Sequence, residues 1–212
     1  MGLLIAVFGP RPGVGVTTVA TSLARSFRSL GSERVAFAEL DVRAVRARSS
    51  GTPATSAGAD RIAIPGINAA LVRMADEIWA LTMTRPRTPA VGDAKGVTLA
   101  LDEIRGRFPV TVAELEHQVN ERTLAAFDAA DRILLVTEGA VPSLRGIQRV
   151  LRLCQRLNYP DEKMCVILNR AGAPSALPPG DVAVVLKRAI YWKIPDGASL
   201  TTEGLAGRLL AE

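Results

Sequence analysis

Short apolar runs recur along the 212-residue chain, and most are separated by stretches with helical periodicity. Each run has the length of one strand and is bounded by residues that favour turns, which is typical of strands buried on both faces. Strands are expected at 2–8, 34–40, 78–83, 109–115, 132–137, 163–169 and 189–194. Strands that alternate with helices predict a doubly wound, three-layer α/β fold with a mostly parallel sheet of seven strands.

The helical stretches place apolar residues three and four positions apart. In TTVATSLARSFRSLG, residues Ala20, Leu23 and Phe27 share one face and Gly31 ends the pattern. Further helices are expected at 68–77, 93–108, 120–131, 142–157, 180–189 and 200–212. The stretches 46–66 and 84–93 are rich in turn-forming residues, so we expect flexible loops there within a single domain spanning 1–212.

Composition narrows the class of protein. Hydrophobic residues make up 48% and charged residues 22%, which fits a folded chain, and the 4% aromatic content implies an aliphatic core. Cys154 and Cys165 fall in apolar patterns, so we expect them to be core residues. Free core cysteines are typical of proteins in a reducing compartment. No apolar stretch is long enough for a membrane helix, and the opening GLLIAVF is too short for a secretion signal. A cytoplasmic location is therefore expected.

The stretch GPRPGVGVTT follows the first expected strand and opens the first expected helix. Phosphate-binding loops have this setting, because glycines let successive backbone N–H groups converge at a helix N-terminus. Gly13 and Gly15 fit such a loop, and Thr17 and Thr18 follow where a Mg²⁺-binding hydroxyl is needed. The lysine that would reach the phosphates is replaced by Val16. An ordinary strand–turn–helix junction is the alternative.

RPGVGVTTVATSLA resembles the deviant Walker A motif of the MinD/ParA group, whose pattern KGGxGKTT precedes an amphipathic helix. The segment 123–172, with DAADRILLVTE, VPSLR, LNYP and ILNRAG, resembles the degenerate ATPase-like domain of the CpaE/TadZ pilus-assembly proteins. Members of that group often lack the same lysine that Val16 replaces here. The resemblance is specific at 9–41 and 123–197 and weak at 46–107. It implies a P-loop NTPase-like fold that binds ATP or ADP with Mg²⁺.

The resemblance also implies roles for single residues. Arg11 matches a lysine that reaches the nucleotide of a dimer partner, and Asp41 matches the carboxylate that positions the attacking water. Thr17 and Glu114 match the Mg²⁺ site, where the family has Asp in place of Glu114. Asn169 matches the reader of the adenine base; turn formation at a strand end is the alternative for it and for Asp41. The expected nucleotide-binding set is Gly13, Val14, Gly15, Val16, Thr17, Thr18, Asn169, Arg170 and Pro195.

Positions on the adenine side keep the family pattern, whereas those for hydrolysis differ at Val16, Glu114 and the switch at 116–118. This asymmetry predicts a nucleotide-binding scaffold with little or no ATP hydrolysis, and the resemblance implies that it forms a homodimer. By resemblance, it would localise or assemble a type IV (Tad/Flp-like) pilus or secretion machine, at the inner face of the membrane or the cell pole. The alternative is an active MinD/ParA-type ATPase in partitioning or division-site placement.

A formal net charge of +5 permits an anionic partner without requiring one. Arg145, Arg149, Arg152 and Arg156 are spaced four, three and four apart, so they line one face of an expected helix. A solvated surface is one interpretation of this stripe. Binding of DNA, an anionic membrane or an acidic protein is the other.

Overall fold

The computed structural model describes residues 1–40, 60–65, 69–74, 76–83, 93–174, 176–197 and 202–212. In this part of the chain the sheet has nine strands in the order β3-β4-β5-β2-β6-β1-β7-β8-β9. The seven expected strands all form, as β1 (Leu3–Phe8), β2 (Val35–Glu39), β5 (Ile78–Met83), β6 (Val110–Glu114), β7 (Arg132–Thr137), β8 (Met164–Ala171) and β9 (Trp192–Pro195). Every neighbouring pair among them is parallel, which confirms the expected fold class.

Two antiparallel strands at one edge correct the expected pattern. β3 (Arg61–Ile64) lies in the segment expected to be a loop, and β4 (Ala69–Arg73) lies in the segment 68–77 that was expected to be a helix. The Ala- and Leu-containing sequence AALVR favours a helix locally, but pairing on both sides with β3 and β5 decides its conformation. Of the two expected loops, residues 46–59, 66 and 84–92 lie outside the described residues.

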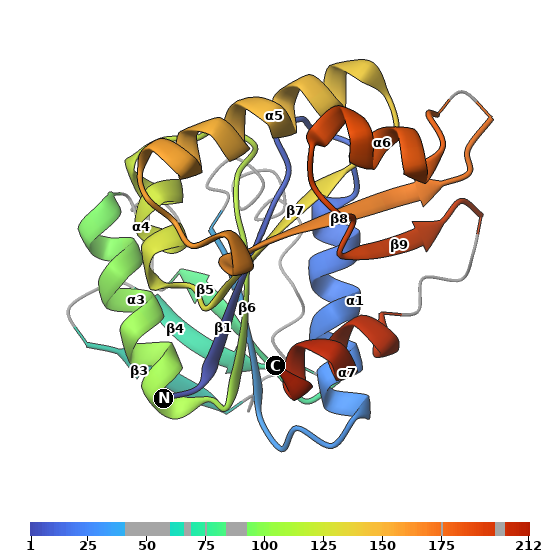
Figure 1. Ribbon diagram of the computed structural model, residues 1–212. Coiled ribbons are helices and arrows are strands. Elements are labelled where there is room, and N and C mark those ends of the chain that lie inside the picture. The colour runs from blue at the N-terminus through green and yellow to red at the C-terminus, as the bar shows by residue number, and fades with distance from the viewer. Residues whose placement is uncertain (41–59, 66–68, 75, 84–92, 175, 198–201) are drawn as a thin grey trace.

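Helices cover both faces of the sheet, as Figure 1 shows. α1 (Val16–Ser29) and α7 (Glu203–Ala211) pack on one face, where Leu23 and Leu205 join Ile5 and Val7 in a fully buried cluster. The other face carries α3 (Ala94–Arg107), α4 (Glu121–Ala129), α5 (Val141–Arg156) and α6 (Pro179–Leu186). These helices match the remaining sequence expectations. No helix in the described residues has both the length and the apolar character needed to cross a membrane.

Local sequence sets where several helices begin and end. Asp93 caps α3 by accepting a hydrogen bond from the Gly96 amide at 2.7 Å, and Asn120 caps α4 by accepting one from the Thr123 amide at 3.0 Å. At the C-terminal end of α1, Gly31 adopts φ 92°, which ends the helix in a left-handed turn.

The strand connections place the glycine loop that follows β1 at the carboxyl ends of the inner strands. β1 is flanked by β6 and β7, and the helices that follow β1 and β7, α1 and α5, lie on opposite faces. Loops that leave neighbouring strands toward opposite faces open a crevice at the carboxyl ends of the strands, where α/β proteins bind ligands. The glycine loop after β1 lies at this crevice.

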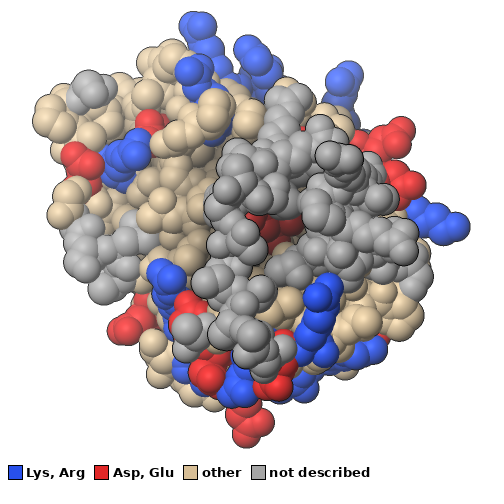
Figure 2. All heavy atoms as spheres, turned by 180° about the vertical axis from the view of Figure 1, so that it is seen from behind, with Lys and Arg blue, Asp and Glu red and all other residues tan. Residues whose placement is uncertain are grey.

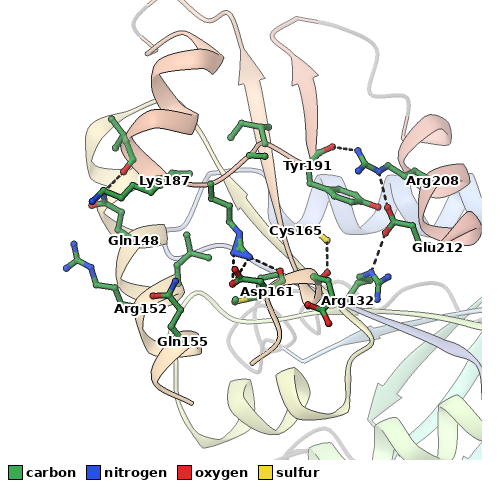
Figure 3. A pocket seen from close by; sticks show the side chains of 18 residues that line it. Arg132, Gln148, Arg152, Gln155, Asp161, Cys165, Lys187, Tyr191, Arg208 and Glu212 are labelled. Carbon is green, nitrogen blue, oxygen red and sulfur yellow. Dashed lines mark hydrogen bonds and ion pairs between the residues drawn. The ribbon is translucent and has the colours of Figure 1, made fainter. Parts of the chain in front are cut away.

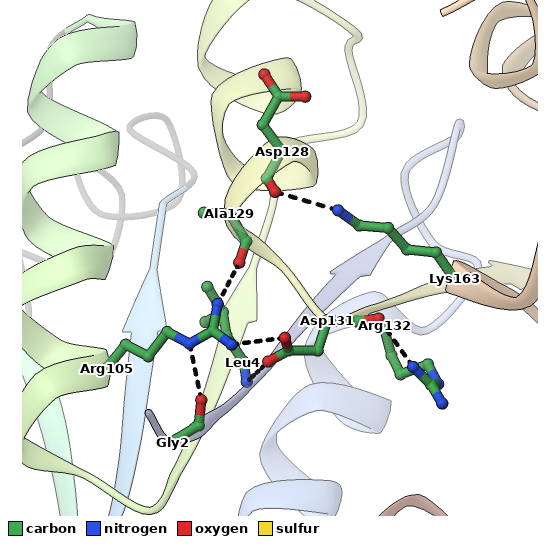
Figure 4. A network of polar contacts seen from close by, with 8 residues as sticks. All are labelled: Gly2, Leu4, Arg105, Asp128, Ala129, Asp131, Arg132 and Lys163. Carbon is green, nitrogen blue, oxygen red and sulfur yellow. Dashed lines mark hydrogen bonds and ion pairs between the residues drawn. The ribbon is translucent and has the colours of Figure 1, made fainter. Parts of the chain in front are cut away.

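Arg105 ties together the opposite end of the sheet, as Figure 4 shows. Its guanidinium donates to the carbonyls of Gly2 at 2.8 Å and Ala129 at 2.9 Å, and to the Asp131 carboxylate at 2.6 Å. Asp131 in turn accepts from the Leu4 amide at 2.8 Å. One partly buried ion pair therefore joins α3, the start of β1, the end of α4 and the start of β7.

Candidate functional site

The glycine loop ends in a helix whose N-terminal amides have no side-chain cap. Gly15 is the N-cap residue of α1, with φ 99°, and no side chain caps the helix there. The first helical hydrogen bond runs from the Val19 amide to the Gly15 carbonyl at 2.9 Å. The amides of Val16, Thr17 and Thr18 therefore precede the helical ladder, as in loops that bind phosphate.

Val16 packs back onto the loop and the core. A Cβ added to Gly9 would lie 2.6 Å from a methyl group of Val14 and 2.6 Å from one of Val16, so both side chains close over the start of the loop. Val16 is half-buried and packs against the cluster between α1 and the sheet. The position that carries the phosphate-binding lysine in the Walker pattern thus serves apolar packing here.

Asn169 and Arg170, at the end of β8, brace the same loop. The Asn169 side chain is 5% exposed, and its Nδ2 donates to the Val14 carbonyl at 2.9 Å. Arg170 donates to the Gly13 carbonyl at 3.3 Å and pairs with the Glu138 carboxylate. The structure brings these two expected nucleotide-binding residues together with the loop. Their contact with a base stays a prediction.

The expected metal-binding pair also meets. The Thr17 hydroxyl donates to the Glu114 carboxylate, which is 4% exposed. Glu39 lies directly opposite Glu114 in the register of β2 and β6, so a second carboxylate ends the neighbouring strand. Parallel strands are about 4.8 Å apart, which places the two acidic residues close together at the carboxyl ends of β2 and β6, beside the loop. The sequence alone does not place Glu39 beside the metal site, because its neighbour across the sheet depends on the register.

The segment 116–118 is held by polar contacts. Glu116 is 7% exposed and accepts hydrogen bonds from Asn120 at 2.7 Å and from Arg122. His117 beside it is half-buried. Since Glu116 is paired with a cation, it contributes little net charge to the site.

The sequence predicts three other site residues. Arg11 and Pro195 are exposed, at the glycine loop and at the end of β9 respectively. Asp41 lies outside the described residues. The metal site expected here rests on two protein oxygen donors, and the described residues contain no cluster of three His, Cys, Asp or Glu side chains able to hold an ion. A bound Mg²⁺ would therefore need phosphate oxygens or water as further ligands.

A separate cleft of about 800 Å³ opens at the other end of the strands, among the starts of β7 and β8 and the helices α5, α6 and α7 (Figure 3). It is separate from the glycine loop, because the cleft lies at the amino ends of these strands and the loop follows the carboxyl end of β1. Burial raises the pKa of the Cys165 thiol in this cleft to about 11 and that of the Tyr191 hydroxyl to about 12. Both groups are therefore protonated at neutral pH, which argues against a nucleophilic role for Cys165.

Comparisons with solved structures agree with this geometry. The MinD cell division protein of Aquifex aeolicus matches all of this chain and 98% of its own, with 21% identity and a TM-score of 0.72. MinD of Pyrococcus horikoshii, solved with Mg-ADP, matches 100% of this chain and 90% of its own, with 14% identity and a TM-score of 0.69. A ParA family ATPase of Chlorobium tepidum matches 99% and 88%, with 15% identity and a TM-score of 0.68.

These likenesses show that the chain has the fold of MinD/ParA-type P-loop ATPases. No protein-family model matches the sequence, and no curated protein matches it.

Proposed function

We propose that the chain binds ATP or ADP with Mg²⁺ in the glycine loop and hydrolyses ATP slowly or not at all. The observation that carries this proposal is a phosphate-type loop and uncapped helix in which the lysine position is filled by the packed side chain of Val16. Removing one preorganised donor from a reaction site typically costs about 2.7–4 kcal/mol of transition-state stabilisation. Backbone amides remain for binding, whereas the catalytic cation is missing.

The residues present fit such a ligand. Amides at the start of α1 would hold the phosphates, and Thr17 with Glu114 would hold Mg²⁺ directly or through water, with Glu39 adjacent. The bound cation would supply the positive charge that Val16 does not. Asn169, Arg170 and Pro195 would lie on the base side, where the first two also fix the loop.

Isothermal titration with ATP and with ADP, each in Mg²⁺, tests the binding. Thr17→Val should weaken affinity at least tenfold, since it removes the hydroxyl that pairs with Glu114. Thr98→Val, an exposed change on α3, is the matched control and should leave affinity unchanged. Phosphate release by the wild-type protein should stay near background. Absence of binding by the wild type would refute the proposal.

We infer further that nucleotide drives formation of a homodimer that acts as a localisation or assembly scaffold for a pilus or secretion machine. The exposed position of Arg11 on the loop supports this, because a guanidinium there can reach a nucleotide held by a second copy. Light scattering with ATP should show a dimer, which Arg11→Ala abolishes and Arg11→Lys retains. A monomer at every nucleotide concentration would contradict the scaffold model.

The second candidate is an active MinD/ParA-type ATPase in partitioning or division-site placement. The contact between Thr17 and Glu114 favours it, because it preserves the pairing of a loop hydroxyl with a strand-end carboxylate. This candidate predicts Mg²⁺-dependent turnover that is lost in Asp41→Ala. Turnover equal to that of a protein-free sample would eliminate it.

A further inference from the structure

The cleft at the amino ends of β7 and β8 has two walls of different electrostatic character. On the side of α7, Glu212 pairs with Arg132 at 3.5 Å and with Arg208 at 3.2 Å, so both cations there have a carboxylate partner (Figure 3). Arg188 is likewise paired with Asp161, at 3.0 Å. These contacts account for three of the five cations that line the cleft.

On the opposite wall the cations have no ion-pair partner within the described residues. Arg152 of α5 and Lys187 after α6 form no ion pair within the described residues, and the remaining lining carboxylate is that of Glu162. The amide side chains of Gln148 and Gln155 stand on the same wall as Arg152. α5 contains no acidic residue, and its other arginines, Arg145, Arg149 and Arg156, are all exposed. Basic side chains project along this edge of the molecule in Figure 2, where α5 lies in Figure 1.

Apolar surface lies within and beside this cationic wall. Leu151, Met164 and Ile190 line the cleft, and Val185 lines it while 39% exposed. Val184, next along α6, is 76% exposed. Gln148 fixes the two helices to each other by donating to the Val185 carbonyl at 2.8 Å. The cleft therefore offers an apolar floor with a cationic edge, and exposed apolar side chains continue beyond it.

We propose that this cleft binds an acidic peptide segment of a partner protein, with apolar side chains in the cleft and carboxylates facing Arg152 and Lys187. Charge complementarity favours this occupant, because its carboxylates match the cationic edge of the cleft. Its apolar side chains match the apolar floor. A DNA backbone would satisfy the arginines of α5 but would leave the apolar floor uncovered, since it offers phosphates and sugars. A small anion would likewise leave the apolar side chains of the cleft uncovered.

Selection of a phage-displayed random dodecapeptide library on the immobilised chain, without nucleotide, tests the proposal. Enriched sequences should combine Asp or Glu with Leu, Ile, Val or Phe. Fluorescence anisotropy of the most enriched peptide should then show at least tenfold weaker binding to Arg152→Glu/Lys187→Glu. The matched control, Arg145→Glu/Arg149→Glu, makes the same charge change on residues outside the cleft lining and should weaken binding less than threefold.

Failure to enrich any binder, enrichment of sequences without acidic residues, or equal weakening by the two double variants would each overturn the proposal. Displacement of the peptide by a 30-base-pair DNA duplex, with loss of DNA binding in Arg152→Glu/Lys187→Glu, would assign the surface to DNA. If that variant does not fold, hydrogen exchange of the wild type decides: peptide-induced protection at 161–165 and 185–191 supports the cleft, and protection confined to other segments refutes it. None of these readouts involves the glycine loop, so absence of nucleotide binding would not affect them.

Discussion

Gly15→Ala is the sharpest test of how the glycine loop is built. Gly15 has φ 99°, and a Cβ added there would lie 2.3 Å from the Asn169 Nδ2 atom. The substitution therefore has two separate costs. One is backbone strain, and the other is displacement of the buried amide that donates to the Val14 carbonyl.

The two costs can be estimated separately. Placing a side chain on a left-handed residue costs about 1–2 kcal/mol. Leaving a buried hydrogen-bonding group without its partner costs about 1–3 kcal/mol. Gly15→Ala should therefore lower the free energy of unfolding by about 2–5 kcal/mol, which is a large share of the stability of a typical domain.

Urea unfolding followed by circular dichroism measures this loss, and Gly31→Ala is the matched control. Gly31 has φ 92° but nothing lies within 4 Å of an added Cβ, so only the strain of about 1–2 kcal/mol applies. Asn169→Ala should cost less in the Gly15→Ala background than in the wild type, because the hydrogen bond is already lost. Equal losses for the two glycine variants, or strictly additive effects of Gly15→Ala and Asn169→Ala, would refute the reasoning.

Three further predictions concern other parts of the molecule. Arg105→Ala should destabilise the fold by about 2–3 kcal/mol in urea unfolding, because it removes three donors to partly buried acceptors. The control Arg107→Ala breaks an exposed pair with Glu103 and should cost less than about 1 kcal/mol. Similar losses for the two variants would contradict the stabilising role of the Arg105 network. Burial raises the pKa values of Cys154 and Cys165 from 9.0 to about 11, so their stabilising contribution is complete below pH 9 and is lost as the pH rises toward 11. The urea midpoint should fall across that range, and less steeply in Cys154→Ala/Cys165→Ala; parallel slopes would exclude the thiols as the cause. Val16→Lys should tighten ATP binding at least tenfold in titration calorimetry. The lysine ammonium would reach the loop, while the methylene groups of the side chain retain the apolar contact near Gly9. Val16→Met is the uncharged control, and equal ATP affinities of the two variants would refute this role for charge.

The sequence was sufficient for the parallel core of the fold. Each buried strand is a continuous apolar run, and the glycine motif sits between a strand and an amphipathic helix, so local patterns carry the information. The edge strand β4 was missed because AALVR favours a helix until two neighbours pair with it. The stripe of arginines on α5 followed directly from helical spacing and is exposed, as that spacing predicts.

Features that depend on register or on several elements could not be predicted. The juxtaposition of Glu39 with Glu114 requires the pairing of β2 with β6, which are 71 residues or more apart in sequence and have no local signal that connects them. The cleft combines side chains from Arg132 to Glu212, on elements whose relative positions arise only from packing. The bracing of the glycine loop by Asn169 likewise joins residues separated by 155 positions.

β8 runs from the cleft to the glycine loop, and this has a thermodynamic consequence. Cys165 lines the cleft and Asn169 holds the loop, four positions apart on one strand, or roughly 13 Å. Any free-energy coupling between the two ends must be reciprocal: if nucleotide changes the affinity for a peptide by some factor, the peptide changes the affinity for nucleotide by the same factor. A ligand at either end can therefore report on the other, and β8, with the hydrogen bond from Asn169 to the Val14 carbonyl, links the two ends.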